Sequence, residues 1–236
     1  MPTKTRKVKS KRLTRTSQSA DSSVALVVEH LRQGIVSGKY KRDSKILPRQ
    51  IADRCKTSFI PVREALRIME SEGFIIFRHN RGAWVTTVSL ADLEDLYDLR
   101  VTLECQLVAK SNPFSDDELE KLKTTIQKMS NAYANNDSGL VVKLNQKFHF
   151  KIYEHGNSER RLRMIRQLWM HAERYQRLSL KVRHNAADEE HLAIVNALAA
   201  RNHDLAAEAL RTHLTTTVSL LKAGWQKVES NPFNEG

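Results

Sequence analysis

The sequence predicts a mainly α-helical protein in two parts: an N-terminal unit of three helices with a small β-hairpin, and a C-terminal all-α bundle of six helices. Three observations support this prediction. Apolar residues repeat at helical spacing over most of the 236 residues, strand-like segments occur only between residues 74 and 88, and all of the excess positive charge lies before residue 89. The first two observations set the fold class. The third indicates that the two parts have different partners.

Charge divides the chain into three stretches. Residues 1–19 hold seven basic side chains and no acidic ones, residues 20–88 have a net charge of +5, and residues 89–236 are neutral, which together give the +12 of the chain. A basic end on a neutral body predicts a polyanionic partner that meets only that end. The alternative is that the positive charge merely aids solubility, but solubility does not explain why the charge is confined to one end of the chain.

Length and composition exclude several classes of protein. The apolar fraction of 40% is enough for real cores, and the length favours two domains over one. The sequence contains no run of about 18 apolar residues, so we predict no transmembrane helix. The basic N-terminus lacks the apolar segment of a secretory signal. Residues 2–19 have few apolar positions and no amphipathic face, so we expect a disordered basic arm rather than a transit peptide. Cys55 and Cys105 fall in different predicted domains and are expected to be reduced thiols.

The first two helices of the N-terminal unit are predicted from apolar spacing and from their ends. The first helix closes near Gly38 and carries one apolar face, made of Val24, Val27, Val28, Leu31 and Ile35. Pro48 fits the first turn of the second helix, where its missing N–H costs little. Lys56-Thr57-Ser58 then forms a tight polar connection, and either Thr57 or Ser58 can cap the third helix.

The third helix has a buried stripe and a separate exposed face. The stripe is made of Val62, Leu66 and Met69, and the exposed face of Phe59, Arg63 and Arg67. A hairpin follows, with strands over 74–78 and 83–88, and Gly82 can supply the positive φ of its tight turn. Helix, turn, helix and β-wing make a winged helix-turn-helix, a geometry that places one helix in the major groove of DNA.

Candidate DNA contacts follow from this geometry. Arg63 and Arg67 offer guanidiniums to phosphates or guanine edges, and Arg49 opens a helix whose N-terminus favours anions. His79 and Arg81 stand at the wing tip, where they can reach phosphates or the minor groove. A solvated helix face and a mobile wing tip are the alternatives. The full set of candidate DNA-binding residues is Arg49, Ser58, Phe59, Arg63, Arg67, His79, Arg81 and Gly82.

From residue 89 onward the pattern is helical. Ser89-Leu90-Ala91-Asp92 is a capping-box-like start, and pairs such as Asn112-Pro113 and Gly156-Asn157 mark breaks between helices. Six helices are expected, over residues 90–110, 115–135, 138–155, 158–178, 186–201 and 203–225.

Polar side chains fall on inward faces of this bundle. Asn145 and His149 lie one turn apart on one helix, and His191 and His213 lie on the apolar sides of two others. A lone inward histidine is usually a hydrogen-bonded core residue, but three from three helices indicate a shared site.

Arg100 falls inside an apolar stripe and therefore needs an anion. That anion can be Glu104, one turn away, or the carboxylate of a small effector held bidentately, and the two are not exclusive. His171 also lies on an apolar stripe, and we interpret it as pocket lining or core.

Together these residues resemble the GntR family of bacterial transcription regulators, FadR-like subgroup. The matching residues are Leu47-Pro48-Arg49, Ile51-Ala52, Pro61-Val62-Arg63-Glu64-Ala65-Leu66, Glu72-Gly73-Phe74, Leu99-Arg100, Leu103-Glu104, Phe148-His149, Gly156-Asn157, Glu190-His191 and His213-Leu214. They cover about residues 20–225, and six helices suit the shorter, VanR-like form of the FCD-type C-terminal domain. Two positions depart from the family: Phe59 stands where members commonly use an Arg on DNA, and Lys56 stands where Gly is usual.

We therefore expect four segments: a disordered basic arm (1–19), a winged helix-turn-helix DNA-binding domain (20–88), a helical effector-binding and dimerisation domain (89–226) and a C-terminal tail (227–236). The resemblance also implies a divalent metal, because related domains bind one through an Asp and three His. The corresponding residues are Asn145, His149, His191 and His213. Asn brings no charge, so the set favours zinc or nickel over Mg²⁺ or Mn²⁺. Arg100 and His171 are the candidate effector-binding residues.

The expected function is that of a homodimeric transcription regulator, cytoplasmic and nucleoid-associated in a bacterium, that binds a palindromic operator in double-stranded DNA under control of a small organic acid. We expect no enzymatic activity and no membrane partner. Two alternatives stay open: a helical-bundle metalloenzyme whose open metal position activates water, and a non-specific architectural protein of nucleic acids. Against a metalloenzyme, no general-base carboxylate is evident near the histidines. An architectural protein would give no role to the bundle's inward polar residues.

Overall fold

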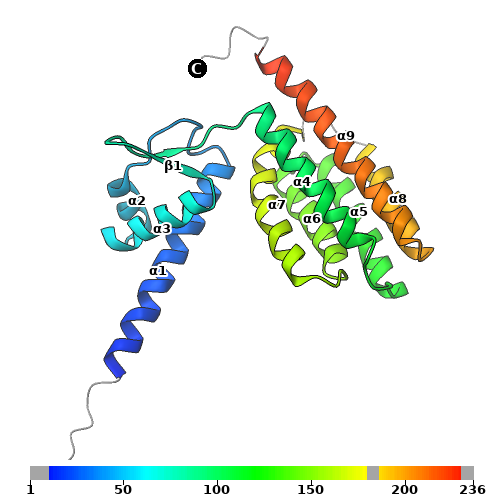
Figure 1. Ribbon diagram of the computed structural model, residues 1–236, viewed down its shortest axis with the longest axis horizontal. Helices are drawn as coiled ribbons and strands as arrows, with labels where there is room; N and C mark the ends of the chain where they lie inside the picture. The colour runs from blue at the N-terminus through cyan, green and yellow to red at the C-terminus, as the bar shows by residue number, and fades with distance from the viewer. Residues whose placement is uncertain (1–10, 180–185, 230–236) are drawn as a thin grey trace, which may run out of the picture. The chain divides into compact units, whose positions relative to one another are not determined.

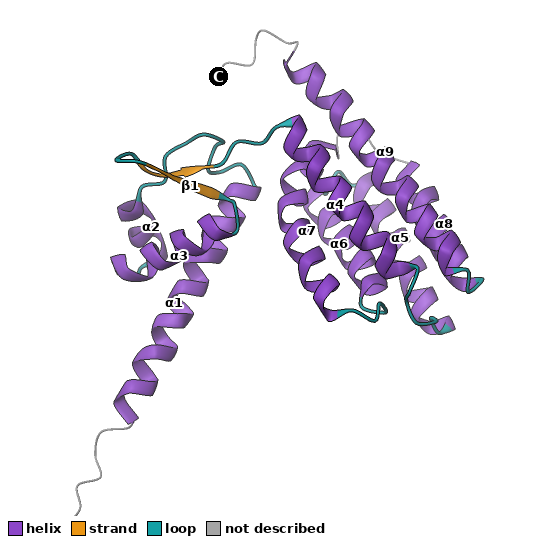
Figure 2. Cartoon of the chain, viewed as in Figure 1, coloured by secondary structure: helices purple, strands orange, loops and turns teal. Residues whose placement is uncertain are grey.

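The computed structural model describes residues 11–179 and 186–229, and the chain divides into two compact units between Thr87 and Val88 (Figure 1). The predicted fold class is confirmed: both units are mainly helical, and the two short strands belong to the N-terminal unit (Figure 2). Across the two described stretches, no helix combines the length and the apolar character that crossing a membrane requires.

The N-terminal unit packs three helices under a two-stranded wing. Its elements are α1 (Lys11–Val36), α2 (Pro48–Cys55), α3 (Phe59–Ser71), β1 (Ile75–Arg78) and β2 (Gly82–Val85). The interior is apolar, since α1 and α3 pack together through residues that include Val27, Leu31, Val62, Leu66 and Met69. This packing confirms the predicted buried stripe of α3 and leaves the opposite face of that helix exposed.

α1 begins earlier than the sequence analysis expects. Residues 11–19 are helical in the structure, whereas residues 1–19 were expected to form a disordered arm; residues 1–10 lie outside the described residues. The physical reason is that no Gly or Pro interrupts the chain between Lys11 and Gly34. Once a helix is nucleated by packing, adding further residues costs little.

The hairpin pairs its strands in antiparallel register, with Ile76 opposite Trp84 and Arg78 opposite Gly82. β1 and β2 are shorter than the predicted strands at the ends far from the turn, since β1 begins at Ile75 and β2 ends at Val85. The turn itself uses positive φ values at both Asn80 (55°) and Gly82 (82°). Gly82 thus supplies the left-handed conformation predicted for it. Lys45 adds a bridge to Trp84, so a third short segment pairs with β2.

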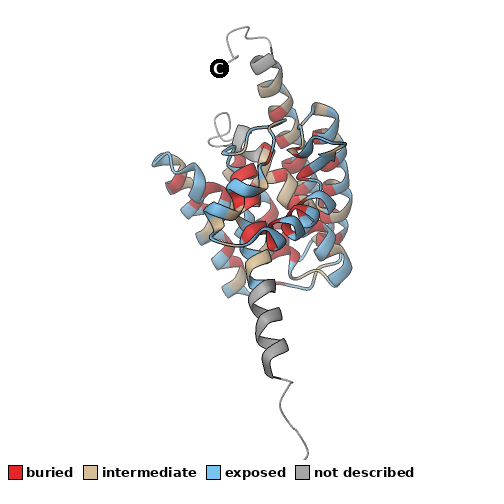
Figure 3. Ribbon diagram, turned by 90° about the vertical axis from the view of Figure 1, so that its left-hand side faces the viewer, coloured by how far each residue is buried: buried red, intermediate tan, exposed pale blue. Residues whose placement is uncertain are grey.

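The C-terminal unit is a helical bundle. Its helices are α4 (Leu90–Val108), α5 (Asp116–Ala134), α6 (Ser138–Tyr153), α7 (Glu159–Ser179), α8 (Ala186–Ala199) and α9 (His203–Glu229). α9 packs along α4 and α8, while α5 packs on α6 and α8, and each of these helices contributes buried residues to the core. Figure 3 colours the residues of the chain by burial. α9 extends past the predicted domain end at 226, and residues 230–236 lie outside the described residues.

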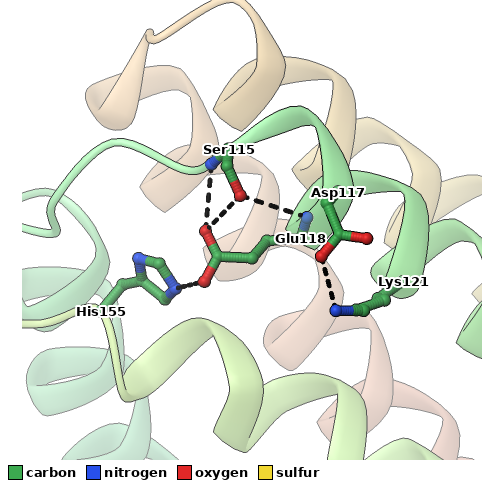
Figure 4. Close-up of polar contacts among 5 residues, drawn as sticks. All are labelled: Ser115, Asp117, Glu118, Lys121 and His155. Carbon is green, nitrogen blue, oxygen red and sulfur yellow. Dashed lines mark hydrogen bonds and ion pairs between the residues drawn. The ribbon is translucent and has the colours of Figure 1, made fainter.

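Helix starts in this unit follow capping chemistry. At Ser89 the hydroxyl accepts a hydrogen bond from the Asp92 amide, as predicted for the start of α4. A full capping box opens α5: the Ser115 hydroxyl accepts from the Glu118 amide, and the Glu118 carboxylate accepts from the Ser115 amide (Figure 4). The other oxygen of Glu118 lies 3.1 Å from Nε2 of His155, which ties this end of α5 to the end of α6.

Candidate functional site

The first candidate site is the outer face of α3. Phe59 and Arg63 are exposed one turn apart, as predicted, on the side opposite the core. Arg67, a further turn along, is also exposed but borders a shallow groove that α3 forms with Val24 and Val28 of α1. Arg63 therefore has the freer approach to a partner that meets the N-terminal end of α3.

The N-terminal end of α3 is unusual in its capping. Ser58 occupies the N-cap position, yet its side chain makes no capping hydrogen bond. The reason lies in the sequence, because Pro61 stands at the third helical position and has no N–H to donate. The first amides of α3 therefore receive no side-chain cap from Ser58, and the N-terminus of a helix favours anions.

The turn before α3 holds a strained lysine. Lys56 has φ 50° and ψ 45°, a left-handed conformation, and its amide bonds back to α2. Such a conformation costs a non-glycine residue about 1–2 kcal/mol, so the turn keeps its tight geometry although a Lys stands where Gly is easier. Arg49, at the start of α2, is exposed as expected.

The wing tip places His79 and Arg81 in solvent. The indole N–H of Trp84 donates to the carbonyl of Arg81 at 3.2 Å, and Arg78 lies over the Trp84 ring at 4.4 Å. The tip backbone is thus held while the two candidate side chains remain available.

The second candidate site is a buried histidine cluster in the C-terminal bundle. His149 on α6, His191 on α8 and His213 on α9 are all buried, and their candidate ligand atoms lie within 4.8 Å of one another. The ring centroids are 4.5 Å apart for His191 and His213 and 5.0 Å apart for His149 and His213. The predicted convergence of three histidines from three helices is confirmed.

Outer partners orient two of these rings. Nδ1 of His213 lies 2.8 Å from Oε2 of Glu190, and Nδ1 of His149 lies 3.1 Å from the hydroxyl of Tyr153. Metal-binding histidines commonly bond one ring nitrogen to such a partner and use the other nitrogen for the ion, so the Nδ1 contacts of these two rings fit that arrangement.

A buried ion pair adjoins the cluster. Nε of Arg100 donates to Glu104 at 2.7 Å, and both side chains are almost fully buried. Tyr153 also donates to this carboxylate, and the indole N–H of Trp169 does so at 3.0 Å. The expected pair of Arg100 with Glu104 is therefore present, and it is linked through Tyr153 to His149.

Electrostatics keep this network in fixed protonation states. Burial alone would lower the pKa of Arg100, but the Glu104 carboxylate, together with Tyr97 and Tyr153, outweighs burial and raises that pKa. Burial, helped by the same carboxylate, raises the pKa of Tyr153 well above its ordinary value. Tyr153 therefore keeps its proton and donates to Glu104, so its oxygen accepts from the Nδ1–H of His149.

A cavity of about 40 Å³ joins the cluster to the ion pair. Its lining includes Arg100, Asn145, His149, His191 and His213. The structure thus brings together all four predicted metal ligands and one of the two predicted effector-binding residues. His171 is half-buried on α7 and is not part of this lining.

The donor set suits a borderline metal ion. Three imidazoles and the amide oxygen of Asn145 are neutral ligands, and imidazole favours zinc, nickel or copper, whereas Mg²⁺ prefers carboxylates. Glu190 and Tyr153 complete the outer layer of hydrogen bonds that such a site needs. The residues present therefore fit a divalent ion.

Sequence reasoning missed two of these partners. Glu190 directly precedes His191, and Tyr153 lies one turn after His149, so helical spacing was a usable signal for Tyr153. The sequence shows no evident general-base carboxylate for the histidines, but two carboxylates, those of Glu190 and Glu104, do lie next to the cluster. Glu190 orients the His213 ring directly and Glu104 acts through Tyr153, so both have a supporting role.

Comparisons with known proteins identify a domain family for each of the two units. Residues 95–216 match the family model of the FCD domain, and residues 24–85 match that of bacterial regulatory proteins of the gntR family. The transcriptional regulator BphR of Paraburkholderia xenovorans is 28% identical over 210 residues, covering 85% of this chain and 86% of that protein. The Nta operon transcriptional regulator of Aminobacter aminovorans is 27% identical over 180 residues, covering 76% and 85%. These relatives are transcriptional regulators rather than enzymes.

The fold is shared with a solved structure. Escherichia coli McbR/YncC superposes with a TM-score of 0.74 at 21% sequence identity, covering 86% of this chain and 98% of that one. The likeness extends over both units.

Proposed function

The chain belongs to the GntR family of transcription regulators with an FCD domain, and from this premise we propose that a small organic acid, bound in a metal-containing cavity of the bundle, controls its binding to a palindromic operator. The observation that carries the proposal is the buried cavity lined by three histidines, Asn145 and Arg100. A regulator that binds DNA but no small ligand does not need so many buried polar groups in its bundle. Each such group costs free energy unless it is paired.

The metal would be held by Asn145, His149, His191 and His213. A bound zinc or nickel ion would supply a positive charge that holds an oxygen ligand. The four protein ligands carry no charge, so the ion's charge is left for a ligand from outside to balance.

Arg100 supports an acid as that outside ligand. Its Nε and Nη2 face Glu104, whereas its Nη1 is buried with no hydrogen-bond partner among the described residues. A buried guanidinium N–H on a cavity wall favours an anionic oxygen, and carboxylates suit guanidinium geometry. The cavity of about 40 Å³ has room for a water or two or for a carboxylate group, so a larger acid requires lining side chains to move.

The DNA-facing part of the proposal rests on α3 and the wing. Arg63, with Arg49 and the wing-tip residues, would contact one half-site, and a homodimer would present two such surfaces to a palindrome. The site of action would be the bacterial cytoplasm, at the nucleoid. A ligand in the bundle changes operator affinity only if it binds the two DNA-binding states unequally.

The experiment begins with elemental analysis of full-length protein purified without a His-tag or a chelator. We expect stoichiometric zinc or nickel, or uptake of either ion on addition, with a rise in melting temperature because the ion binds only the folded state. His149→Ala and His213→Ala should abolish uptake. Asn145→Asp should tighten it, since an anionic ligand is restored.

The matched control is His203→Gln, which changes a histidine on the same helix as His213 whose ring bonds to Ser111 instead. It should leave metal uptake unchanged. Wild-type protein that stays metal-free with added zinc and nickel would contradict the metal part of the proposal, and Arg100 would remain as the acid-binding group. Operator affinity unchanged by any small carboxylate would contradict control by an acid.

A further inference from the structure

Two large apolar side chains are exposed at the N-terminal end of α3. Phe59 and Ile60, the first two residues of the helix, are 51% and 70% exposed, and Ile60 has the highest exposure of the large apolar side chains in those parts of the chain where side-chain burial is described. The fold does not require them there, because the core side of α3 is already filled by Val62, Leu66 and Met69. We call these two residues the Phe59–Ile60 patch.

The patch lies among cationic side chains. Arg63 follows Phe59 by four residues and Ile60 by three, so it is a neighbour of both on the helix surface. Lys56 is exposed in the preceding turn. A partner that covers this surface must therefore be anionic and must also offer apolar groups at close spacing.

DNA meets both requirements in its major groove. The phosphates supply the charge, and the 5-methyl group of thymine is the apolar group on the base edges. The end of α3 is also suited to end-on entry, since the Ser58 hydroxyl is not used for capping and N-terminal residues of a recognition helix contact the bases.

We propose that Phe59 and Ile60 recognise thymine methyl groups in the operator half-site, next to the contact made by Arg63. The inference rests on the proposed DNA-binding function and specifies the chemistry that its recognition helix reads. An apolar pair at the tip of the helix selects thymine by burying its methyl, and it offers no hydrogen bond to guanine or adenine.

The test removes single methyl groups from the DNA. An operator is first selected from random duplex DNA with the full-length protein, and each thymine is then replaced in turn by deoxyuridine, which keeps base pairing and lacks only the methyl. We expect affinity to fall about four-fold at one or two positions in each half-site, which corresponds to the ~0.8 kcal/mol of one buried methyl-sized group. Phe59→Ala and Ile60→Ala should each remove the deoxyuridine effect at the position that residue reads.

Leu26→Ala is the matched control, because Leu26 is 53% exposed on α1 of the same unit. It should retain every deoxyuridine effect of the wild type. Melting temperatures should not change in any of the three variants, since the side chains are exposed.

Three outcomes would overturn the inference. Selective operator binding that is insensitive to deoxyuridine at every position would show that no methyl is read. Equal deoxyuridine sensitivity in wild type and both patch variants would assign the methyl contact elsewhere. Loss of self-association in the variants, with DNA selectivity intact, would make the patch a contact between copies of this chain. A wild type without any selective DNA binding would instead defeat the proposed function itself.

Discussion

In the N-terminal unit the fully buried side chains are apolar and the described cations are exposed or half-buried, whereas the C-terminal unit fully buries an arginine, a glutamate and three histidines. Among the described residues, the buried polar or charged side chains are Arg100, Glu104, His149, His191, His213 and Thr217, all in the bundle. Surface groups such as Arg63 can be changed without touching a core. In the bundle the same side chains decide both the stability of the fold and what the cavity binds, because buried charges must stay paired.

The sharpest test of this contrast is Glu104→Ala. It leaves the buried Arg100 guanidinium without its carboxylate and should lower the free energy of unfolding by about 3–5 kcal/mol, measured by urea denaturation. Asp117→Ala breaks a pair at the same i, i+4 spacing, but Asp117 and Lys121 are both exposed, so we expect a loss below about 1 kcal/mol. Equal losses in the two variants would remove the distinction between the two kinds of pair.

Arg63→Ala tests the surface side of the comparison. It should weaken operator binding by about 1–3 kcal/mol if the guanidinium makes a bidentate base contact, while the unfolding midpoint stays unchanged because the side chain is exposed. Binding to operator and to random DNA should be measured side by side. An unchanged affinity ratio would exclude Arg63 from base recognition.

Tyr153→Phe tests whether the bundle's outer hydrogen bonds serve binding as well as stability. It removes the hydroxyl that faces Nδ1 of His149 and should weaken zinc affinity by about 10- to 100-fold, as loss of such partners typically does. The control is Tyr175→Phe, which removes a hydroxyl that donates to a different carboxylate, that of Asp92. The zinc affinities of both variants can be measured by calorimetric titration. Equal zinc affinities in the two variants would show that Tyr153 has a purely structural role.

The smallest expected effect comes from a half-buried carboxylate at the start of α5. Hydrogen bonds from the Ser115 amide and hydroxyl lower the pKa of Glu118 from 4.5 to about 2 (Figure 4). A lowered folded-state pKa means that the ionised group contributes stability above pH 4.5, and that this contribution is lost as the pH falls toward 2. The melting temperatures of wild type and Glu118→Gln should therefore converge over that range. A difference in melting temperature that stayed constant down to pH 2 would show that ionised Glu118 does not contribute this stability.

Periodicity predicted much of both sites because their residues lie on regular helices. Asn145 and His149 fall on the apolar side of α6, and the side chains that share that face are buried together. The exposed face of α3 followed from the same argument at Phe59 and Arg63. Neither prediction required knowledge of how the helices pack.

The sequence alone could not predict which side chains form hydrogen bonds between helices. Tyr153 donates to Glu104 across 49 residues, a contact that depends on how α6 is placed along α4. The unused cap at Ser58 was readable in principle, since Pro61 has no N–H to offer. The early start of α1 at Lys11 was not, because nothing in a basic, polar stretch marks where helix propagation stops.

The three histidines also bear on how the bundle opens. α6, α8 and α9 each contribute one ring, and separate helices ordinarily exchange their amide protons through separate local openings. An ion shared by the rings would couple those openings, because releasing any one helix would break the common coordination. Amide exchange in the three helices would then slow together and by a similar factor, while exchange in the N-terminal unit kept its own rate.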